Sequence, residues 1–231
     1  MKIVECQNLC KSFDNKKVLV DINLNIEAGK IIGLLGKNGS GKTTLLKLIN
    51  DLLTPTSGQV LIKNQKPGID SKKIISYLPE RHYLDSNMTV KNIIKYFADF
   101  YDDFNTTKAY DLLEKLAINS NDKLSTMSKG TKEKVNLILV MSRKADLYVL
   151  DEPIGGVDPA TRDYILNTIL NNFADNASII LSTHLIADVE RILDEVVFID
   201  NGKIVLQADA DQLRTKRKKS IDEIFREEFK C

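Results

Sequence analysis

Eight consecutive residues have the composition of a loop that binds phosphate groups. Gly36 to Thr43 reads G-K-N-G-S-G-K-T and fits the spacing G-x-x-x-x-G-K-S/T. Glycines let backbone N–H groups close around the α- and β-phosphates of a nucleotide. We expect Lys42 to reach the β- and γ-phosphates and the Thr43 hydroxyl to hold Mg²⁺. The residues expected to contact the nucleotide here are Gly36, Asn38, Gly39, Ser40, Gly41, Lys42, Thr43 and Thr44.

Two adjacent carboxylates follow a second apolar run. Residues 147–150 have the pattern of a buried strand, and Asp151 and Glu152 come directly after them. Such a strand delivers its last side chains to the sheet edge at which a phosphate loop opens. Asp151 therefore suits Mg²⁺, directly or through water, and Glu152 suits polarisation of an attacking water. A strand simply capped by acids is the alternative, which the neighbouring phosphate loop disfavours.

The elements that must position these residues follow from the hydrophobic pattern. Strands are predicted at 2–8, 18–26, 31–35, 59–63, 73–77, 147–150, 178–183, 196–200 and 203–207. Helices are predicted at 42–53, within 89–144, from 159 with Asp158 as N-cap, around 186–193 and at 220–230. Strands that alternate with helices indicate an α/β fold. We expect a P-loop core with a mainly parallel sheet, an attached antiparallel β-subdomain and a helical subdomain inserted at about 86–145.

Composition limits the class of protein. The 231 residues are 43% hydrophobic and 28% charged, which suffices for one compact unit with a sizeable core. A net charge of +1 gives no support to nucleic-acid binding, which we do not expect. No apolar run approaches the ~20 residues of a membrane span, and the start of the chain does not read as a signal peptide. Cys6, Cys10 and Cys231 lack metal-ligand spacing, so we expect free thiols in a reducing compartment.

Taken together, the motifs resemble those of the nucleotide-binding subunits of ABC (ATP-binding cassette) transporters. The resemblance covers about residues 1–215 and leaves 216–231 as a charged C-terminal helix. The segment 127–131, M-S-K-G-T, resembles the family signature L-S-G-G-Q. The segment 152–159, E-P-I-G-G-V-D-P, resembles the catalytic glutamate joined to the D-loop, which places Asp158 in the D-loop.

Two aromatic residues gain a role from the same resemblance. S-T-H at 182–184 resembles the switch histidine, so His184 is expected to hydrogen-bond the γ-phosphate. Phe13 lies 23 residues before Gly36, where the family places a ring against adenine; stacking of this kind is worth roughly 1–3 kcal/mol. A core phenylalanine is the alternative for Phe13. His82 has no such context and is interpreted as an ordinary surface or loop histidine.

The resemblance implies an ATPase that drives a separate membrane-spanning permease. Catalysis is then assigned to Lys42, Glu152 and His184, with ATP and Mg²⁺ as cofactors. The signature residues Ser128, Lys129 and Gly130 are expected to meet ATP bound to another subunit, in a head-to-tail homodimer or a heterodimer with a related cassette. The expected location is the cytoplasm, peripheral on the inner face of the cell membrane through the permease.

The chain departs from the family pattern in the signature, where Lys129 and Thr131 replace a glycine and the glutamine, and at the Q-loop. Lys129 replaces the first glycine of the signature, and this lysine could strengthen contact with ATP or point into solvent. Glu80 stands where the family has the glutamine of the Q-loop, in the string Y-L-P-E. Its carboxylate could approach Mg²⁺, so Glu80 joins Thr43 and Asp151 as a candidate metal ligand, or it could bind a positive group on the permease.

Other readings of the chain stay open at this point. The helical segment, the Y-L-P-E string and the tail resemble small bacterial export cassettes, with an importer as the alternative. A soluble ABC ATPase that acts on ribosomes or DNA is disfavoured by the single cassette and the absence of a long coiled-coil insertion. A small-molecule kinase gives no reason for the signature. The basic run 216–219 either starts a solvated helix or contacts anionic lipid headgroups.

Overall fold

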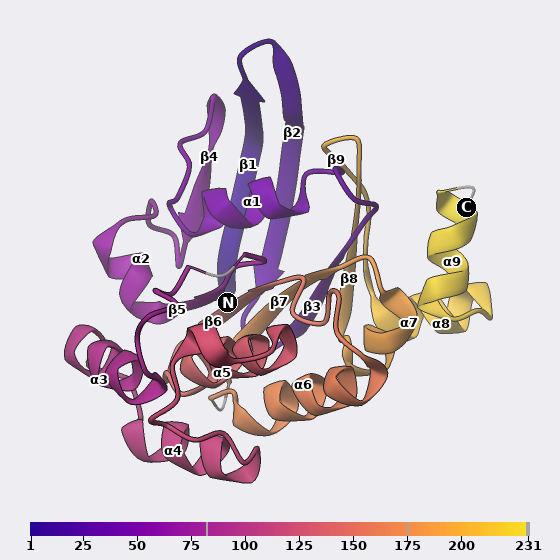
Figure 1. Ribbon diagram of the computed structural model, residues 1–231. Coiled ribbons are helices and arrows are strands. Elements are labelled where there is room, and N and C mark those ends of the chain that lie inside the picture. Colours follow the sequence, from indigo (N-terminus) through magenta and orange to yellow (C-terminus); the bar gives the residue numbers. More distant parts are fainter. Residues whose placement is uncertain (82, 175, 230–231) are drawn as a thin grey trace.

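The computed structural model describes residues 1–81, 83–174 and 176–229, and at its centre is a six-stranded sheet (Figure 1). Five strands are parallel and β9 is antiparallel at one edge. Their order is β5 (Ile75–Leu78), β6 (Leu147–Asp151), β7 (Ser178–Thr183), β3 (Ile31–Leu35), β8 (Glu195–Asp200) and β9 (Lys203–Asp209). The predicted α/β class with a mainly parallel sheet is confirmed.

The register of the parallel strands brings their polar ends together. Every residue of β6 and of β7 is buried, as their continuous apolar runs predict. Asp151 pairs with Ser182, and Leu35 pairs with Thr183. The carboxyl ends of β6, β7 and β3 therefore meet at one edge of the sheet, directly beside the loop that follows β3.

An antiparallel sheet with the order β2-β1-β4 lies above this core (Figure 1). It contains β1 (Lys2–Phe13), β2 (Lys16–Glu27) and β4 (Ser57–Ile62). β1 extends well beyond the predicted end at residue 8, where Asn8 has a positive φ of 46° and the register with β2 shifts. Such an irregularity interrupts the side-chain alternation on which the prediction relied. The helix α1 (Lys42–Ile49) lies between the two sheets, with its leucines in their shared hydrophobic core.

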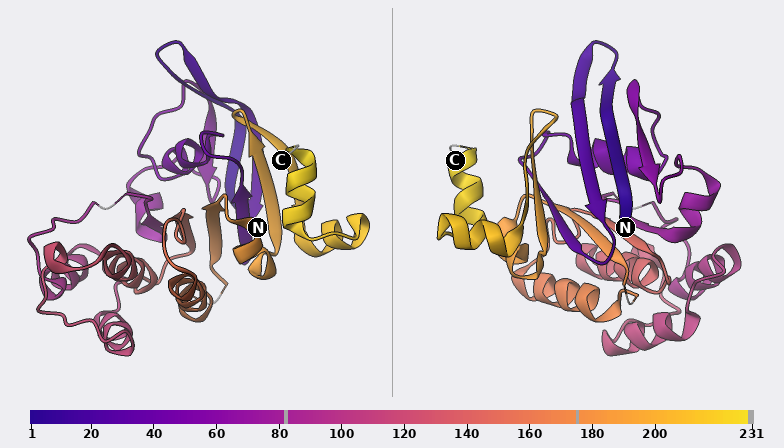
Figure 2. Two further views of the ribbon diagram at one scale, coloured as in Figure 1. Left: turned by 45° about the vertical axis from the view of Figure 1, so that its right-hand side comes forward. Right: turned by 180° about the vertical axis from the view of Figure 1, so that it is seen from behind.

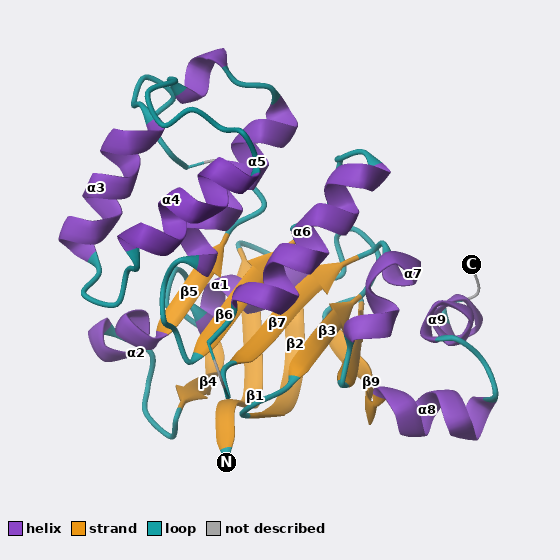
Figure 3. Ribbon diagram, turned by 90° about the horizontal axis from the view of Figure 1, so that it is seen from below, coloured by secondary structure: helices purple, strands orange, loops and turns teal. Residues whose placement is uncertain are grey.

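The opposite face of the central sheet is covered by helices (Figure 3). These are α5 (Lys129–Met141), α6 (Pro159–Asn172) and α7 (Ile186–Val189), which is followed by the 3₁₀ turn η2 (Glu190–Ile192). Asp158 caps α6 as predicted, because its side chain accepts a hydrogen bond from the Thr161 N–H at 3.0 Å. A short helix, α2 (Ile69–Ile74), precedes β5 and was not predicted.

The helices expected between the phosphate loop and β6 gather at the β5 edge of the sheet (Figure 3). They are α3 (Val90–Phe100), α4 (Thr106–Lys115), the 3₁₀ turn η1 (Leu124–Thr126) and α5, and they share a hydrophobic cluster of their own. Lys108 of α4 donates hydrogen bonds to the carbonyls of Met141 (2.5 Å) and Asn172, the last residues of α5 and α6. One ammonium group thus joins the helical segment to the core, and burial lowers its pKa.

The end of the chain forms two helices at the β8–β9 edge, away from the helical segment (Figure 2, Figure 3). α8 (Ala210–Arg217) was not predicted and stops at Lys218, which has a positive φ of 54°, so the tail is not one continuous helix from residue 216. α9 (Ile221–Glu228) lies within the helix predicted at 220–230. α9 buries Ile221, Ile224 and Phe225 in the main core. In the basic run, Arg217 pairs with Glu228 at 2.9 Å and Lys219 pairs with Glu227. None of the helices in the described ranges is long and apolar enough to cross a bilayer.

Candidate functional site

The loop from Gly36 to Thr43 connects β3 to α1 and depends on its glycines. A side chain on Gly36 would place Cβ 2.5 Å from the Ile199 carbonyl oxygen and 2.6 Å from Ser40 Oγ. Gly39 and Gly41 have φ angles of 80° and 111°, in the left-handed region that favours glycine. α1 begins after Gly41 with no side-chain cap, so its first N–H groups face the loop and can bind an anion.

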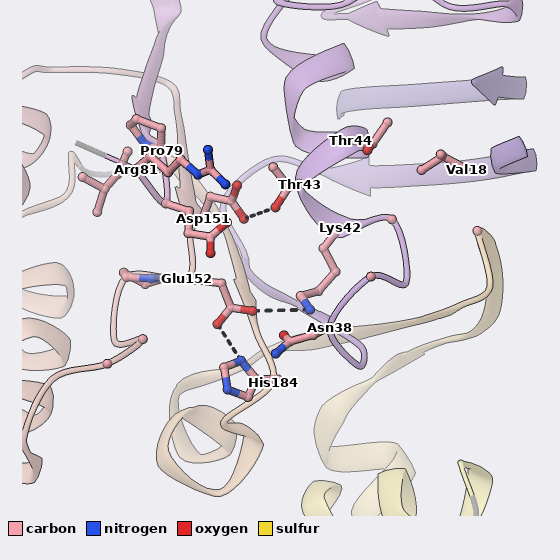
Figure 4. A pocket seen from close by; sticks show the side chains of 18 of the residues that line it. Val18, Asn38, Lys42, Thr43, Thr44, Pro79, Arg81, Asp151, Glu152 and His184 are labelled. Atoms are coloured by element: carbon pink, nitrogen blue, oxygen red, sulfur yellow. Dashed lines mark hydrogen bonds and ion pairs between the residues drawn. The ribbon is translucent and has the colours of Figure 1, made fainter. Parts of the chain in front are cut away.

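Lys42 is the buried cation of this loop. The residue is only 5% exposed, and its Nζ donates hydrogen bonds to the carbonyls of Gly36 (2.7 Å) and Lys37 (3.2 Å). The same Nζ lies 3.3 Å from Glu152 Oε1 in an ion pair. The structure therefore brings together the lysine and the glutamate to which the sequence assigned catalysis (Figure 4).

Asp151 is a buried carboxylate with one oxygen satisfied and one not. Its Oδ1 accepts hydrogen bonds from Thr43 Oγ1 (3.2 Å) and Ser182 Oγ (2.6 Å), whereas Oδ2 is buried without a hydrogen-bond partner. Burial raises the pKa of Asp151; the two hydroxyls oppose the rise, and the charges of Glu80 and Glu152 add to it. A buried anion with a free oxygen is stabilised by a nearby cation.

These properties fit a Mg²⁺ site built from Thr43 and Asp151. The described residues contain no cluster of three or more His, Cys, Asp or Glu side chains arranged to hold a metal. Mg²⁺ commonly binds one or two protein groups and completes its shell with phosphate oxygens and water, so a two-residue site suffices. Glu80 lines the same cavity and acts on the pKa of Asp151, so its role as a further ligand stays a prediction.

Glu152 is held in an unusual backbone conformation by several contacts. Its φ of 50° is rare for a residue with a side chain, and such strain often occurs at functional sites. Its N–H donates to the Ser182 carbonyl (3.0 Å) and to Ser182 Oγ (3.1 Å). Its Oε2 lies 3.0 Å from His184 Nδ1, so the carboxylate bridges Lys42 and His184 (Figure 4).

An open cavity of about 1220 Å³ lies over these groups. Among the predicted residues it is lined by Asn38, Gly39, Gly41, Lys42, Thr43, Thr44, Glu80, Lys129, Asp151, Glu152 and His184. Gly36 and Ser40 shape the loop from beneath, and Ser40 Oγ is buried without a hydrogen-bond partner. One chain therefore gathers the predicted phosphate, metal and water-activating residues around one space.

Phe13 lies at the end of β1 and is not part of this lining. The residue is 42% exposed, and Lys11 Nζ sits 4.8 Å from the centre of its ring. This exposure argues against the alternative of a core phenylalanine. The nearby residues 16–18 do line the cavity, and the contact of Phe13 with adenine stays a prediction.

The signature residues lie at the start of α5. Ser128 is the N-cap, and its Oγ accepts from the Thr131 N–H at 3.2 Å. Ser128 and Lys129 are exposed, and a Cβ on Gly130 would meet no atom within 4 Å. Lys129 pairs with Glu133 at 3.7 Å and lines the cavity, whereas Ser128 and Gly130 do not.

Sequence reasoning missed several residues of the site. Ser182 anchors both Asp151 and Glu152, and a serine near the end of an otherwise apolar strand was a usable signal. Arg81 lines the cavity next to Glu80, although no motif marked it (Figure 4). Val18 also lines the cavity, from β2. His82 lies outside the described residues.

A family model, curated relatives and a solved structure all match this chain to the same family. The family model described as ABC transporter matches residues 19–155. The ABC transporter ATP-binding protein YtrB of Bacillus subtilis (strain 168) is 32% identical over 219 residues, which are 92% of this chain and 74% of the relative. The SkfA peptide export ATP-binding protein SkfE of the same organism is 29% identical over 211 residues, 89% of this chain and 88% of the relative.

A solved structure described as an ATP-binding subunit of an ABC transporter superimposes with a TM-score of 0.86. It is 27% identical, and the match covers 97% of this chain and 98% of the other. A small-molecule kinase is excluded by these matches. The chain belongs to the ABC transporter family, as one of its ATP-binding, ATP-hydrolysing subunits.

Proposed function

We propose that this ATPase subunit works as a head-to-tail dimer that powers export through a membrane permease. ATP-binding subunits of this family pair with permease subunits. The dimer is supported by a difference between the phosphate-binding residues and the signature residues. Lys42, Asp151 and Glu152 converge in one cavity. Of the signature residues only the exposed Lys129 reaches that cavity, Ser128 and Gly130 do not, and the space over Gly130 is open. A second cassette would then place its own signature over this chain's ATP.

The proposed reaction is attack of water on the γ-phosphate. Glu152 orients the water and accepts its proton, which leaves ADP and phosphate as products. Lys42 moves from Glu152 and the loop carbonyls to the phosphates, which frees Glu152 Oε1 for the water. His184 moves its hydrogen bond from Glu152 to the γ-phosphate. Thr43 and Asp151 would hold Mg²⁺, which would supply positive charge beside the phosphates.

Export is favoured over import by the relatives. SkfE is named for export of a peptide, and the lantibiotic transport protein SrtF of Streptococcus pyogenes is 28% identical over 90% of this chain and 92% of its own. We propose a small bacterial export cassette at the cytoplasmic face of the membrane. The cargo would be selected by the permease.

The variant Glu152→Gln tests the catalytic and dimer proposals together. The amide keeps the size of the side chain but accepts a proton poorly, so turnover should fall at least about 100-fold. With MgATP, the variant should elute as a dimer in size-exclusion chromatography, whereas the parent should not accumulate one. Glu114→Gln, on the exposed side of α4, is the matched control. Turnover at the parent rate would refute the assignment of Glu152, and a monomer with bound ATP would refute the dimer.

A further inference from the structure

Lys37, the second residue of the phosphate loop, reaches out of the loop to the end of α9. Its Nζ donates a hydrogen bond to the Phe229 carbonyl at 3.1 Å and lies 5.9 Å from the centre of the Phe229 ring. Phe229 is the C-cap of α9. The last carbonyls of a helix lack partners within the helix and carry partial negative charge, so an ammonium group is favourable there. Two segments 192 residues apart in sequence therefore meet at the phosphate loop.

The backbone of Lys37 is bound to the inside of the loop. Its carbonyl accepts hydrogen bonds from Lys42 Nζ (3.2 Å) and from the Ser40 N–H (3.2 Å). The same residue is thus held by α9 through its side chain and by the catalytic lysine through its main chain.

α9 is itself fixed to the strand beside the loop. The Phe229 ring stacks on Phe225 with centroids 4.0 Å apart, and Phe225 meets Phe198 of β8 edge-on at 5.3 Å. Phe198 is fully buried and pairs in register with Leu35, the residue before Gly36. The next residue of β8, Ile199, has its carbonyl beneath Gly36. The rings of Phe229, Phe225 and Phe198 therefore pack α9 against β8, the strand that contacts the start of the phosphate loop.

We propose that Lys37 is a positioning residue, through which the docked α9 holds the phosphate loop in the shape that binds nucleotide. Lys37 acts through the loop backbone and touches neither the reacting atoms nor the metal. Because coupling between two sites is reciprocal, nucleotide binding must in turn stabilise the docked α9. The tail helix thereby becomes a place at which a partner or a modification can change ATP affinity.

The first test compares nucleotide affinities of Lys37 variants. Lys37→Met keeps the stem and loses the charge, and we expect about two- to fivefold weaker binding of a non-hydrolysable MgATP analogue by calorimetry. Lys37→Arg keeps the charge and should stay within twofold of the parent. Lys66→Met, at an exposed lysine in the segment between β4 and α2, is the matched control. Unchanged affinity in Lys37→Met, or an equal loss in Lys37→Arg, would overturn the proposal.

The second test asks whether α9 and Lys37 act as one unit. Phe229→Ala removes the stacked ring, and its effect on affinity should not add to that of Lys37→Met in the double variant. Amide hydrogen exchange of 221–228 should slow on adding the analogue in the parent and not in Lys37→Met. A purely structural role for α9 would give additive losses and no nucleotide-dependent protection, and either result would reject the coupling.

Discussion

The two halves of the proposed nucleotide site, the phosphate side and the signature side, differ in how far a single chain completes them. On the phosphate side, the side chains of Lys42 and Glu152 are 6% and 10% exposed, and Asp151 is fully buried. On the signature side, Ser128 and Lys129 are exposed, and their hydrogen bonds and ion pairs stay within the first turns of α5. Folding alone therefore fixes the geometry of the first half, whereas in the proposed dimer the second half is completed only when another cassette contacts it.

Alanine substitutions at Gly36 and Gly130 should show the largest difference between the phosphate side and the signature side. Gly36→Ala puts a methyl group against backbone, and overpacking of this kind costs about 1–3 kcal/mol, so affinity for a MgATP analogue should fall about ten- to hundredfold in the isolated chain. Gly130→Ala meets open space and should leave that affinity unchanged. In the assembled transporter, however, the methyl group that Gly130→Ala adds should obstruct the partner's ATP and lower ATPase activity about tenfold or more.

Gly68 is the matched control for this pair. A Cβ at Gly68 also meets nothing within 4 Å, so Gly68→Ala should alter neither binding nor turnover. If Gly130→Ala weakened analogue binding in the isolated chain, the signature would belong to the chain's own site and the contrast between the halves would be lost.

The residues of the phosphate side could be predicted from sequence because each lies in a short contiguous motif. The spacing of residues 36–43 predicts a loop between a strand and a helix. The apolar run before Asp151 predicts a strand whose carboxyl end carries that aspartate. Parallel pairing then brings those ends together without further information, as the register of Asp151 with Ser182 illustrates.

The remaining features depend on contacts between distant segments. Nothing in the composition around Lys37 indicates the Phe229 carbonyl, because a lysine in a loop can take any surface direction. α8 was missed because only Ala210 and Leu213 are buried and most of its residues are polar. Phe13 was expected at the adenine only through the family resemblance, because an aromatic residue by itself suits a core as well as a binding surface; its 42% exposure agrees with that expectation.

The substitution Glu80→Gln tests how negative charge affects the phosphate side of the site. Its charge adds to the rise in the pKa of Asp151, so Glu80→Gln should ease that repulsion while keeping a polar group in the cavity. We expect ATPase activity of the transporter to stay within about tenfold of the parent, or ~1.4 kcal/mol. Steady-state phosphate release, with Glu114→Gln as control, measures this. Complete loss of turnover would assign the acid a distinct role, such as direct binding of Mg²⁺.

Replacing Asp151 and replacing Asp158 by asparagine should change the free energy of unfolding in opposite directions. Burial raises the pKa of Asp151 above its ordinary value of 3.8, so the charged form costs stability at neutral pH. Hydrogen bonds from Thr161 lower the pKa of the exposed Asp158, so its charged form is favoured. In urea unfolding of the nucleotide-free chain at pH 7, Asp151→Asn should raise the free energy of unfolding by about 1 kcal/mol, and Asp158→Asn should lower it.

The pH dependence separates these two effects. As pH falls from 7 through the raised pKa of Asp151, the folded state takes up the proton before the unfolded state does, so this residue's penalty fades and the advantage of Asp151→Asn shrinks. The contribution of Asp158 persists above pH 3.8 and is lost only as pH falls through its lower folded pKa. If Asp151→Asn destabilised the chain at pH 7, the bonds from Thr43 and Ser182 would outweigh burial, and the phosphate side would be complete without a cation.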